Sequence, residues 1–322
     1  MSGSRVAIGF DIGGTKVLGA VVDEQGKVLD RHRVPSDPQW SEMLAAIVAV
    51  TQELRSRRPD VVALGIGAAG MVDREGTIHY APNVPGFRRT PVQREVGERT
   101  GMPTVVDNDA NVAAFGEQQV GAAQGLHDAM VITLGTGIGC GVIADGKILR
   151  GAWGFAAESG HFQIDPNGPM CACGERGHWE AMASGNALGR MAREAAEAGR
   201  LPSVLAHAGG KVSDVHGQHV SAAARDGKED ALALVDAYAF NVAIGLVGLA
   251  NIFDPAVIAI SGGLVTDGDL FLVPMRRHFK GHLEGTEYRT TPEIVPAALG
   301  EEAGVVGAGL LALDRLDHPL SR

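Results

Sequence analysis

The sequence predicts an α/β protein built from two domains, and three observations support this fold class. Short apolar runs of strand length alternate with longer segments that have the periodicity of helices. Many of the 45 glycines lie in clusters where expected strands end, as glycines in tight turns beside ligands do. A strand–turn–strand pattern at 10–29 returns at 132–149, which indicates a duplicated domain within the 322 residues.

The first half of the chain begins with strands and turns and continues with helices. An apolar run at 5–10 predicts a buried strand, and the turn DIGGTK leads to a second strand at 17–23. Apolar residues recur at helical spacing from Met43 to Leu54, so a helix is expected over 40–57. The other expected elements are strands at 27–34, 61–66 and 104–106 and a helix at 110–120.

The second half repeats this order and adds helices. Its expected strands lie at 130–134, 141–144, 148–150, 257–260 and 293–296. Its expected helices lie at 184–198, 229–252, 275–284 and 305–316. Residues 201–228 are the least regular stretch, and we expect them to form an exposed connection.

Composition and charge exclude several classes of protein. The net charge of −10 opposes binding to nucleic acid or to an anionic membrane. Three cysteines are too few for a disulfide framework and fit reducing cytosol. The apolar stretch after Arg5 soon meets Asp11, unlike a signal peptide, and the longest apolar run, 242–253, is too short to span a bilayer. A soluble cytoplasmic protein is therefore expected.

Residues 171–180 (CACGERGHWE) carry the strongest chemical signal in the chain. Cys171 and Cys173 precede His178, and His161 lies ten residues before Cys171, so four ligands are available for a tetrahedral Zn²⁺. Glu158 and Glu180 flank these ligands and suit hydrogen bonds to sugar hydroxyls. The alternative is that the cysteines are small buried apolar residues that bind no metal.

Gly-rich turns at the ends of expected strands predict a nucleotide site. The first turn offers phosphate oxygens the backbone N–H groups of Gly13 and Gly14, the hydroxyl of Thr15 and the positive charge of Lys16. Asp11 lies beside this turn and suits Mg²⁺ bound through water. Thr136 and Gly137 occupy the corresponding turn of the second half. A tight hairpin without a ligand is the alternative for that second turn.

The segment DNDAN, residues 107–111, lies where an expected strand meets an expected helix. Ligands of α/β sheets gather beyond such strand ends. Asp109 can act as a general base on a hydroxyl, and Asn108 can hydrogen-bond to a neighbouring hydroxyl. The alternative is that one of Asp107, Asn108 and Asp109 caps the helix.

Taken together and in order, these motifs resemble the ROK family of sugar kinases and sugar-responsive repressors. The matching segments are DIGGTK, DNDAN, LGTGIG, ESGH, CACGERGHWE, ISGG and the late AGVVGAG at 303–309. Within the family they look most like actinobacterial ATP-dependent glucokinases. The resemblance implies the actin-like ATPase (ribonuclease H-like) fold, with two α/β domains around a central cleft. We expect one domain at 1–118 with 301–322 and the other at 119–300.

The resemblance also implies a reaction and residue roles. The reaction is transfer of the γ-phosphoryl group of ATP to the 6-hydroxyl of glucose, with Asp109 as the base. The residues implied to bind the sugar are Asn108, Asp109, Glu158, His161 and Glu180. Those implied to hold ATP and Mg²⁺ are Asp11, Gly13, Gly14, Thr15, Lys16, Thr136, Gly137, Gly262 and Gly263. A structural Zn²⁺ is implied on His161, Cys171, Cys173 and His178, although the family usually has a third cysteine where this chain has His178.

Several alternatives stay open within this resemblance. The sugar can be N-acetylmannosamine, fructose, mannose or allose in place of glucose. Polyphosphate is a second phosphoryl donor in the family, but its users usually have DIGGSG where this chain has DIGGTK, which favours ATP. A non-catalytic sugar-responsive regulator is the third alternative, although family repressors carry an N-terminal helix-turn-helix and DIGGTK begins here at Asp11. Homodimers and homotetramers are both common in the family.

Overall fold

The structure, a computed structural model, describes residues 5–14, 16–81, 84 and 86–318. Contacts between Cα atoms divide the chain into two compact units. Unit 1 comprises Met1–Val131, Gly141–Ala157 and Ala297–Arg322, and unit 2 comprises Ile132–Cys140 and Glu158–Pro296. The domain limits expected from the resemblance, 1–118 with 301–322 and 119–300, stay a prediction.

The sheet of unit 1 has five strands in the order β3-β2-β1-β4-β7. Their bounds are β1 (Val6–Ile12), β2 (Lys16–Asp23), β3 (Val28–Pro35), β4 (Val61–Ala68) and β7 (Thr104–Asn108). The first three strands pair antiparallel, whereas β4 runs parallel to both β1 and β7. The carboxyl ends of β1, β4 and β7 therefore meet at one edge, where α/β sheets bind ligands.

The second five-stranded sheet has the order β10-β9-β8-β11-β12. Its strands are β8 (Ala129–Leu134), β9 (Ile138–Ala144), β10 (Lys147–Ile148), β11 (Val257–Ser261) and β12 (Glu293–Pro296). The order is that of the first sheet, with β8, β9 and β10 in the places of β1, β2 and β3 and β11 and β12 in those of β4 and β7. The two strand–turn–strand patterns recognised in the sequence thus open two sheets of one topology.

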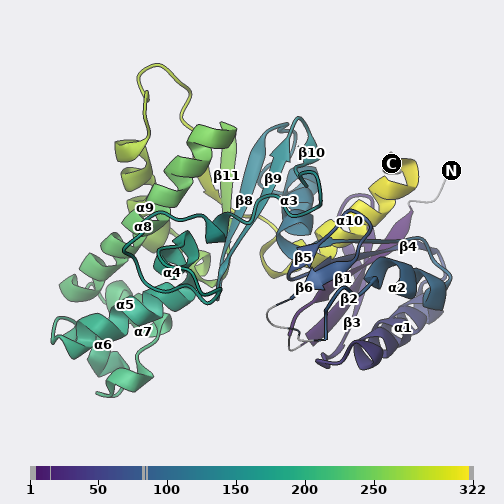
Figure 1. The fold of residues 1–322 in the computed structure, drawn as a ribbon, viewed down its shortest axis with the longest axis horizontal. Helices are drawn as coiled ribbons and strands as arrows, with labels where there is room; N and C mark the ends of the chain where they lie inside the picture. Colours follow the sequence, from purple (N-terminus) through teal and green to yellow (C-terminus); the bar gives the residue numbers. More distant parts are fainter. Residues whose placement is uncertain (1–4, 15, 82–83, 85, 319–322) are drawn as a thin grey trace. The chain divides into compact units, whose positions relative to one another are not determined.

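Helices cover both faces of the first sheet (Figure 1). On one face, α1 (Trp40–Arg57) and α2 (Val92–Thr100) pack on the strands, and Met43, Ile47 and Leu54 of α1 are fully buried. On the other face, α10 (Ala303–Asp317) crosses β1 and β4 and packs on α3 (Asp109–Val120). A side chain at Gly9 or Gly65 would collide with the backbone of α10, so these glycines permit the close approach.

Unit 2 contains six α-helices among the residues that the structure describes. They are α4 (Trp179–Ala183), α5 (Gly185–Glu197), α6 (Pro202–His207), α7 (Gly217–Arg225), α8 (Glu229–Phe253) and α9 (Asp269–His282). The long helix α8 packs on α4, α7 and α9. The indole of Trp179 donates to the Asn241 carbonyl at 3.1 Å, and the hydroxyl of Tyr238 donates to the Ala183 carbonyl at 2.7 Å. These two bonds attach α4 to the core.

Among the described helices, α8 alone is long and apolar enough to cross a membrane. The length and composition of α8 are the only grounds for this possibility. In this structure Tyr238, Val242 and Leu246 are fully buried against neighbouring helices, as in the core helix of a globular domain.

The prediction of an irregular connection at 201–228 was wrong. The segment forms α6, a 3₁₀ turn at Val212–Asp214 and α7, and its residues Val204 and Val220 are fully buried. The helices are only six and nine residues long, so tertiary packing stabilises them more than any periodic pattern of their own. The helix expected at 275–284 begins earlier, at Asp269, and ends at His282, with Pro274 in its first turns.

Candidate functional site

The predicted phosphate turn of unit 1 opens at the carboxyl end of β1. Asp11 pairs in register with Gly67 of β4, and Gly67 pairs with Asp107 of β7, so both acids lie at one level of the sheet. The backbone N–H of Gly13 donates to the carbonyl of Lys16 at 3.1 Å, which closes the turn. Gly14 is exposed on it, and the predicted residue Thr15 lies outside the described residues.

Asp11 lies in a partly buried position beside the first turn of α10. Burial raises the pKa of its carboxyl, and the charge of Lys16 opposes that rise. A side chain at Gly304 would place its Cβ 3.2 Å from the carboxyl carbon of Asp11. The glycine of the late AGVVGAG motif therefore leaves room around the carboxylate that is predicted to position Mg²⁺.

Asn108 links the end of β7 to the start of α3. Its side-chain oxygen accepts hydrogen bonds from the backbone N–H groups of Ala110 at 2.9 Å and Asn111 at 3.2 Å, which caps the helix. Its side-chain amide donates one hydrogen bond to the Gly70 carbonyl at 3.1 Å. An amide nitrogen has two hydrogens, so capping leaves one donor for another partner.

Asp109 is the first residue of α3, and its side chain is open to solvent. Its carboxylate accepts a hydrogen bond from the backbone N–H of Ala110 at 2.9 Å. Surrounding protein atoms still limit its hydration, and this desolvation raises the pKa of Asp109. The Ala110 N–H opposes the rise, and the negative charge of Asp11 adds to it. An accessible carboxylate with a raised pKa is suited to accept a proton from a hydroxyl.

In unit 2 the predicted turn GTG lies against Glu180 and the start of α5. The N–H of Gly185 donates to the carbonyl of Gly135 at 2.8 Å, and the carboxylate of Glu180 accepts from the N–H of Ile138 at 2.9 Å. A side chain at Gly137 would collide with the Glu180 carboxylate. The structure thus brings Gly137 and Glu180, predicted as phosphate and sugar contacts, into direct proximity.

Gly262 and Gly263 follow β11 at the same end of the second sheet. Gly262 has φ of +105°, and a side chain there would collide with the carbonyl of Leu134 at the end of β8. A residue with a side chain would be strained at this position and would push the two strand ends apart. Gly263 begins a short 3₁₀ helix, Gly263–Asp267.

A pocket of about 470 Å³ lies within unit 2, next to these glycines. Leu134, Gly135, Thr136 and Gly263 line it at the strand ends. The sequence analysis missed its other polar lining residues, which are Asn186, Gln218, Ser221, Arg225 and Asp267. Three of them lie on α7, inside the segment that was expected to be irregular, and no motif marks them. Arg225 Nε donates to Asp267 Oδ1 at 3.0 Å across this wall.

The four predicted zinc ligands lie together in unit 2. One ligand atom from each of His161, Cys171, Cys173 and His178 lies within 4.8 Å of the other three. Cys171 Sγ is 3.8 Å from His161 Nδ1, and Cys173 Sγ is 3.2 Å from His178 Nδ1. Tetrahedral Zn²⁺ with bonds of about 2.0–2.3 Å separates its ligands by about 3.3–3.8 Å. The two distances and the donor set fit such an ion, and His178 points into the cluster.

His161 lies between this cluster and the predicted sugar contacts. It ends a short 3₁₀ helix, Ser159–His161, that Glu158 precedes, and both side chains are exposed. Since Nδ1 faces Cys171, the Nε2 edge of the ring is left for another partner. Glu180 lies close as well, with Oε1 3.7 Å from Cys171 Sγ. Burial is the main cause that raises the pKa of the Cys171 thiol to about 11, and a bound divalent cation would reverse this by deprotonating the thiol.

The predicted residues thus form one group in each unit. In unit 1 the described members are Asp11, Gly13, Gly14, Lys16, Asn108 and Asp109. In unit 2 they are Thr136, Gly137, Glu158, His161, Cys171, Cys173, His178, Glu180, Gly262 and Gly263.

Comparisons with known proteins extend the match over nearly the whole chain. The profile of the ROK family matches residues 7–315. The glucokinase of Streptomyces coelicolor is 42% identical over 310 residues, which are 95% of this chain and 97% of that protein.

Solved structures agree with the sequence matches. The crystal structure of a ROK family glucokinase from Streptomyces griseus, in complex with glucose and AMPPNP, is 42% identical, covers 96% of this chain and 99% of its own, and has a TM-score of 0.84. The ROK hexokinase from Thermus thermophilus is 33% identical, covers 97% and 99%, and has a TM-score of 0.80. The predicted α/β class and actin-like ATPase fold are confirmed, and the chain belongs to the ROK family.

Proposed function

We propose that this protein is an ATP-dependent glucokinase that transfers the γ-phosphoryl group of ATP to the 6-hydroxyl of glucose. The observation that carries the proposal is the carboxylate of Asp109, accessible and with a raised pKa, at the start of α3. Similarity over almost the full length to the Streptomyces glucokinases supports the choice of reaction. Phosphoryl transfer depends on positioning and charge neutralisation. The predicted residues of unit 1 and of unit 2 include groups suited to both tasks.

In this proposal Asp109 accepts the proton of the attacking hydroxyl. The free amide hydrogen of Asn108 donates to a neighbouring hydroxyl, while its oxygen keeps capping α3. Glu158, Glu180 and the Nε2 edge of His161 bind the remaining hydroxyls. Glu180 already accepts the N–H of Ile138 through Oε2, so Oε1, which lies 3.7 Å from Cys171 Sγ, is the oxygen offered to the sugar.

The pocket of unit 2 is proposed to bind the nucleoside of ATP. Thr136, Gly137, Gly262 and Gly263 lie at the strand ends beside it, and the first residues of α5 and α7 line it. Helix N-termini present N–H groups and positive dipole ends to anions. The residues proposed to contact phosphates in unit 1 are Gly13, Gly14, Thr15 and Lys16.

Two metal ions are part of the proposal. Asp11 would hold Mg²⁺ through water, and the ion supplies neutralisation of phosphate charge when bound. His161, Cys171, Cys173 and His178 would hold Zn²⁺, which fixes the ring of His161 and its tautomer. The zinc ligands serve the sugar contact and take no part in the transfer itself.

We also propose the setting expected from the sequence. The protein works in the cytoplasm as a homodimer or homotetramer, with the domain division 1–118 and 301–322 against 119–300 and without a nucleic acid partner. Sedimentation of the purified protein, with and without added DNA, tests the oligomeric state and the absence of a nucleic acid partner.

The function is tested by ADP release from ATP and Mg²⁺ in the presence of glucose, mannose, fructose, allose or N-acetylmannosamine. We expect the highest kcat/KM with glucose. Asp109→Ala should lower kcat by about 10²–10⁴-fold, the usual contribution of a general base. Asp60→Asn is the matched control, because Asp60 is exposed and its carboxylate pairs with Arg58. A preference for another sugar would replace glucose and keep the mechanism, whereas no turnover with any sugar would refute the kinase.

A further inference from the structure

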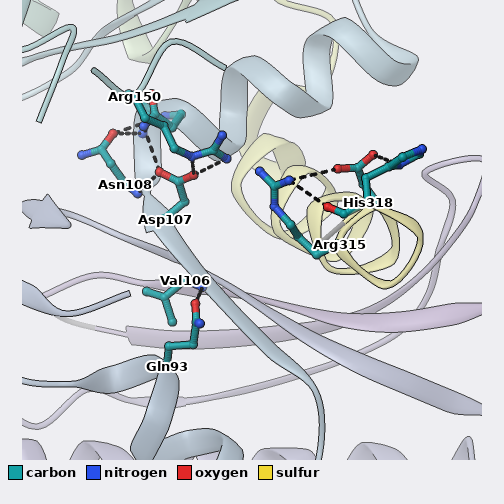
Figure 2. A network of polar contacts seen from close by, with 10 residues as sticks. Gln93, Val106, Asp107, Asn108, Arg150, Arg315 and His318 are labelled. Carbon is teal, nitrogen blue, oxygen red and sulfur yellow. Dashed lines mark hydrogen bonds and ion pairs between the residues drawn. The ribbon is translucent and has the colours of Figure 1, made fainter. Parts of the chain in front are cut away.

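Asp107 and Arg150 form a buried ion pair beside the DNDAN turn. Arg150 Nε and Nη2 lie 2.7 and 2.6 Å from Asp107 Oδ2. The side chains are 6% and 12% exposed for Asp107 and Arg150, respectively, so both charges are largely removed from water. Figure 2 shows the guanidinium of Arg150 against the carboxylate of Asp107. Neither residue has a role in the reaction described above.

The other oxygen of Asp107 holds the turn that carries Asp109. Asp107 Oδ1 accepts from the N–H of Asn108 at 2.8 Å and from the side-chain amide of Asn111 at 2.8 Å. These bonds span the end of β7 and the first turn of α3, on both sides of Asp109. The position of the Asp107 carboxylate therefore determines the path of the backbone at the proposed base.

The strand β7 needs this support because it is the edge of its sheet. One side of β7 pairs with β4, and the side chain of Gln93 accepts the N–H of Val106 at 3.1 Å in place of another strand (Figure 2). At the next residue, Asp107, the backbone pairs with Gly67 of β4, and the side chain adds the ion pair with Arg150. The ion pair therefore adds a buried side-chain restraint at the end of an edge strand.

Arg150 itself is held on a second element. It follows β10, and the next residue, Gly151, accepts a hydrogen bond from Arg74 Nε at 3.0 Å. The other nearby guanidinium, that of Arg315, donates to the carbonyl of His318 at 3.1 Å (Figure 2). Among the described residues, Arg150 is the cation bonded to Asp107.

We infer that Arg150 is a positioning residue for phosphoryl transfer, which fixes Asp107 and through it the turn that presents Asp109. The inference rests on the proposed kinase function. Arginine suits the role because its planar fork meets one carboxylate oxygen with two N–H groups, and lysine can supply the charge without that geometry. A misplacement of about 1 Å at a reacting group costs about 10²-fold in rate.

The test compares Arg150→Met, Arg150→Lys and the double variant Asp107→Asn/Arg150→Met with the wild-type enzyme. We expect Arg150→Met to lower kcat about 100-fold, with KM for glucose and ATP changed less than about threefold, since the residue touches neither substrate. Arg150→Lys should recover part of kcat. The matched control is Arg94→Met, which removes an exposed guanidinium paired with Glu98 on α2 and should keep kcat near that of the wild type.

The double variant separates positioning from folding. It removes the unpaired buried charge that Arg150→Met leaves, so its Tm should rise above that of Arg150→Met. Its kcat should stay low, because the turn is still not held. A kcat that recovers together with Tm would show a merely structural role and overturn the inference. So would an Arg150→Met enzyme with kcat within threefold of wild type. A wild-type protein that phosphorylates no sugar would refute the proposed function, and the inference would fall with it.

Discussion

Asp109 must be ionised to accept a proton, and its surroundings oppose ionisation. Desolvation and the charge of Asp11 both raise the pKa of its carboxyl above the ordinary value of 3.8. A base with a raised pKa loses its active carboxylate form at a higher pH as the solution is acidified. We therefore expect the acidic limb of the kcat/KM profile for the sugar to lie above pH 3.8, and initial rates across the acidic range measure it.

The Asp11→Asn variant provides a directional check of this pH dependence. Removing the negative charge of Asp11 removes one cause of the raised pKa, so the acidic limb should move to lower pH. Rates are measured at saturating Mg²⁺, because Asp11 is also the proposed Mg²⁺ contact. Enzyme returned to pH 7 after each exposure must regain its activity, which excludes acid unfolding. An acidic limb that stays in place would contradict the coupling between the two carboxylates.

Individual residues were predictable from the sequence where a motif constrains them tightly. His161, Cys171, Cys173 and His178 were identified from spacing and resemblance, and the structure brings their ligand atoms together. The two interpretations of Asn108 were not exclusive, because its oxygen caps α3 while its amide keeps a free hydrogen. Arg150 could not be found this way, since its partner Asp107 lies 43 residues away and no motif contains both.

At the level of elements, α3 depends on a buried carboxylate near its other end. Glu117 is fully buried, and its oxygens accept the backbone N–H groups of Ala122 at 2.7 Å, Ala298 at 3.0 Å and Leu299 at 2.8 Å. It thereby attaches α3 to the chain that leads into α10. Three backbone donors in partly buried hydrogen bonds lose their acceptor if this side chain is removed.

Glu117→Ala should therefore lower the free energy of unfolding by about 3 kcal/mol, at about 1 kcal/mol for each of the three hydrogen bonds lost. Glu117→Gln keeps one acceptor oxygen and should lose less. Glu98→Ala, at an exposed position on α2, should change stability by less than about 0.5 kcal/mol. Urea unfolding followed by circular dichroism measures all three. Equal stability of the Ala and Gln variants would argue against hydrogen bonding as the cause.

Elements with a strong apolar period were predicted almost to the residue, and those without one were not. The helix α1 has the expected bounds, and α8 ends one residue later than expected, because each has a continuous buried face. The helices α6 and α7 are six and nine residues long, too short for such a face, and tertiary contacts decide them. The polar lining of the pocket was missed for the same reason, because Gln218, Ser221 and Arg225 lie on α7, a helix that the sequence analysis did not predict.

For the whole molecule, the sequence predicted the duplication but not the polar wall of the pocket. Two sheets of one strand order follow from the repeated pattern at 10–29 and 132–149, because that pattern encodes the first three strands of each sheet. The pocket depends on which helices approach the strand ends of unit 2, and that choice is made by packing across long sequence separations. The periodicity of apolar residues within a short window of sequence cannot predict contacts between residues far apart in the chain.

Metal removal tests whether the proposed zinc site stabilises one unit or the whole chain. His178 is the residue directly before α4, and the first residue of that helix, Trp179, is fully buried and bonded to Asn241 of α8. Loss of the ion should therefore increase amide exchange at 161–178 first and in α4 next. The strands β1 and β4 of unit 1 should keep their protection, because none of the four ligands belongs to that unit. Hydrogen exchange with and without a chelator measures each segment.

Variants at His178 give the matched comparison for zinc. His178→Ala should weaken zinc binding and reproduce the exchange seen with the chelator. His178→Cys should strengthen binding, since it restores a third thiolate, the softer ligand. His219→Ala, on α7 and outside the cluster, should leave zinc content unchanged. Less than one zinc per chain in protein made with ample zinc, or equal exchange with and without chelator, would refute the site. In that outcome the hydrogen bonds of Trp179 and Tyr238, rather than an ion, hold α4 on the core.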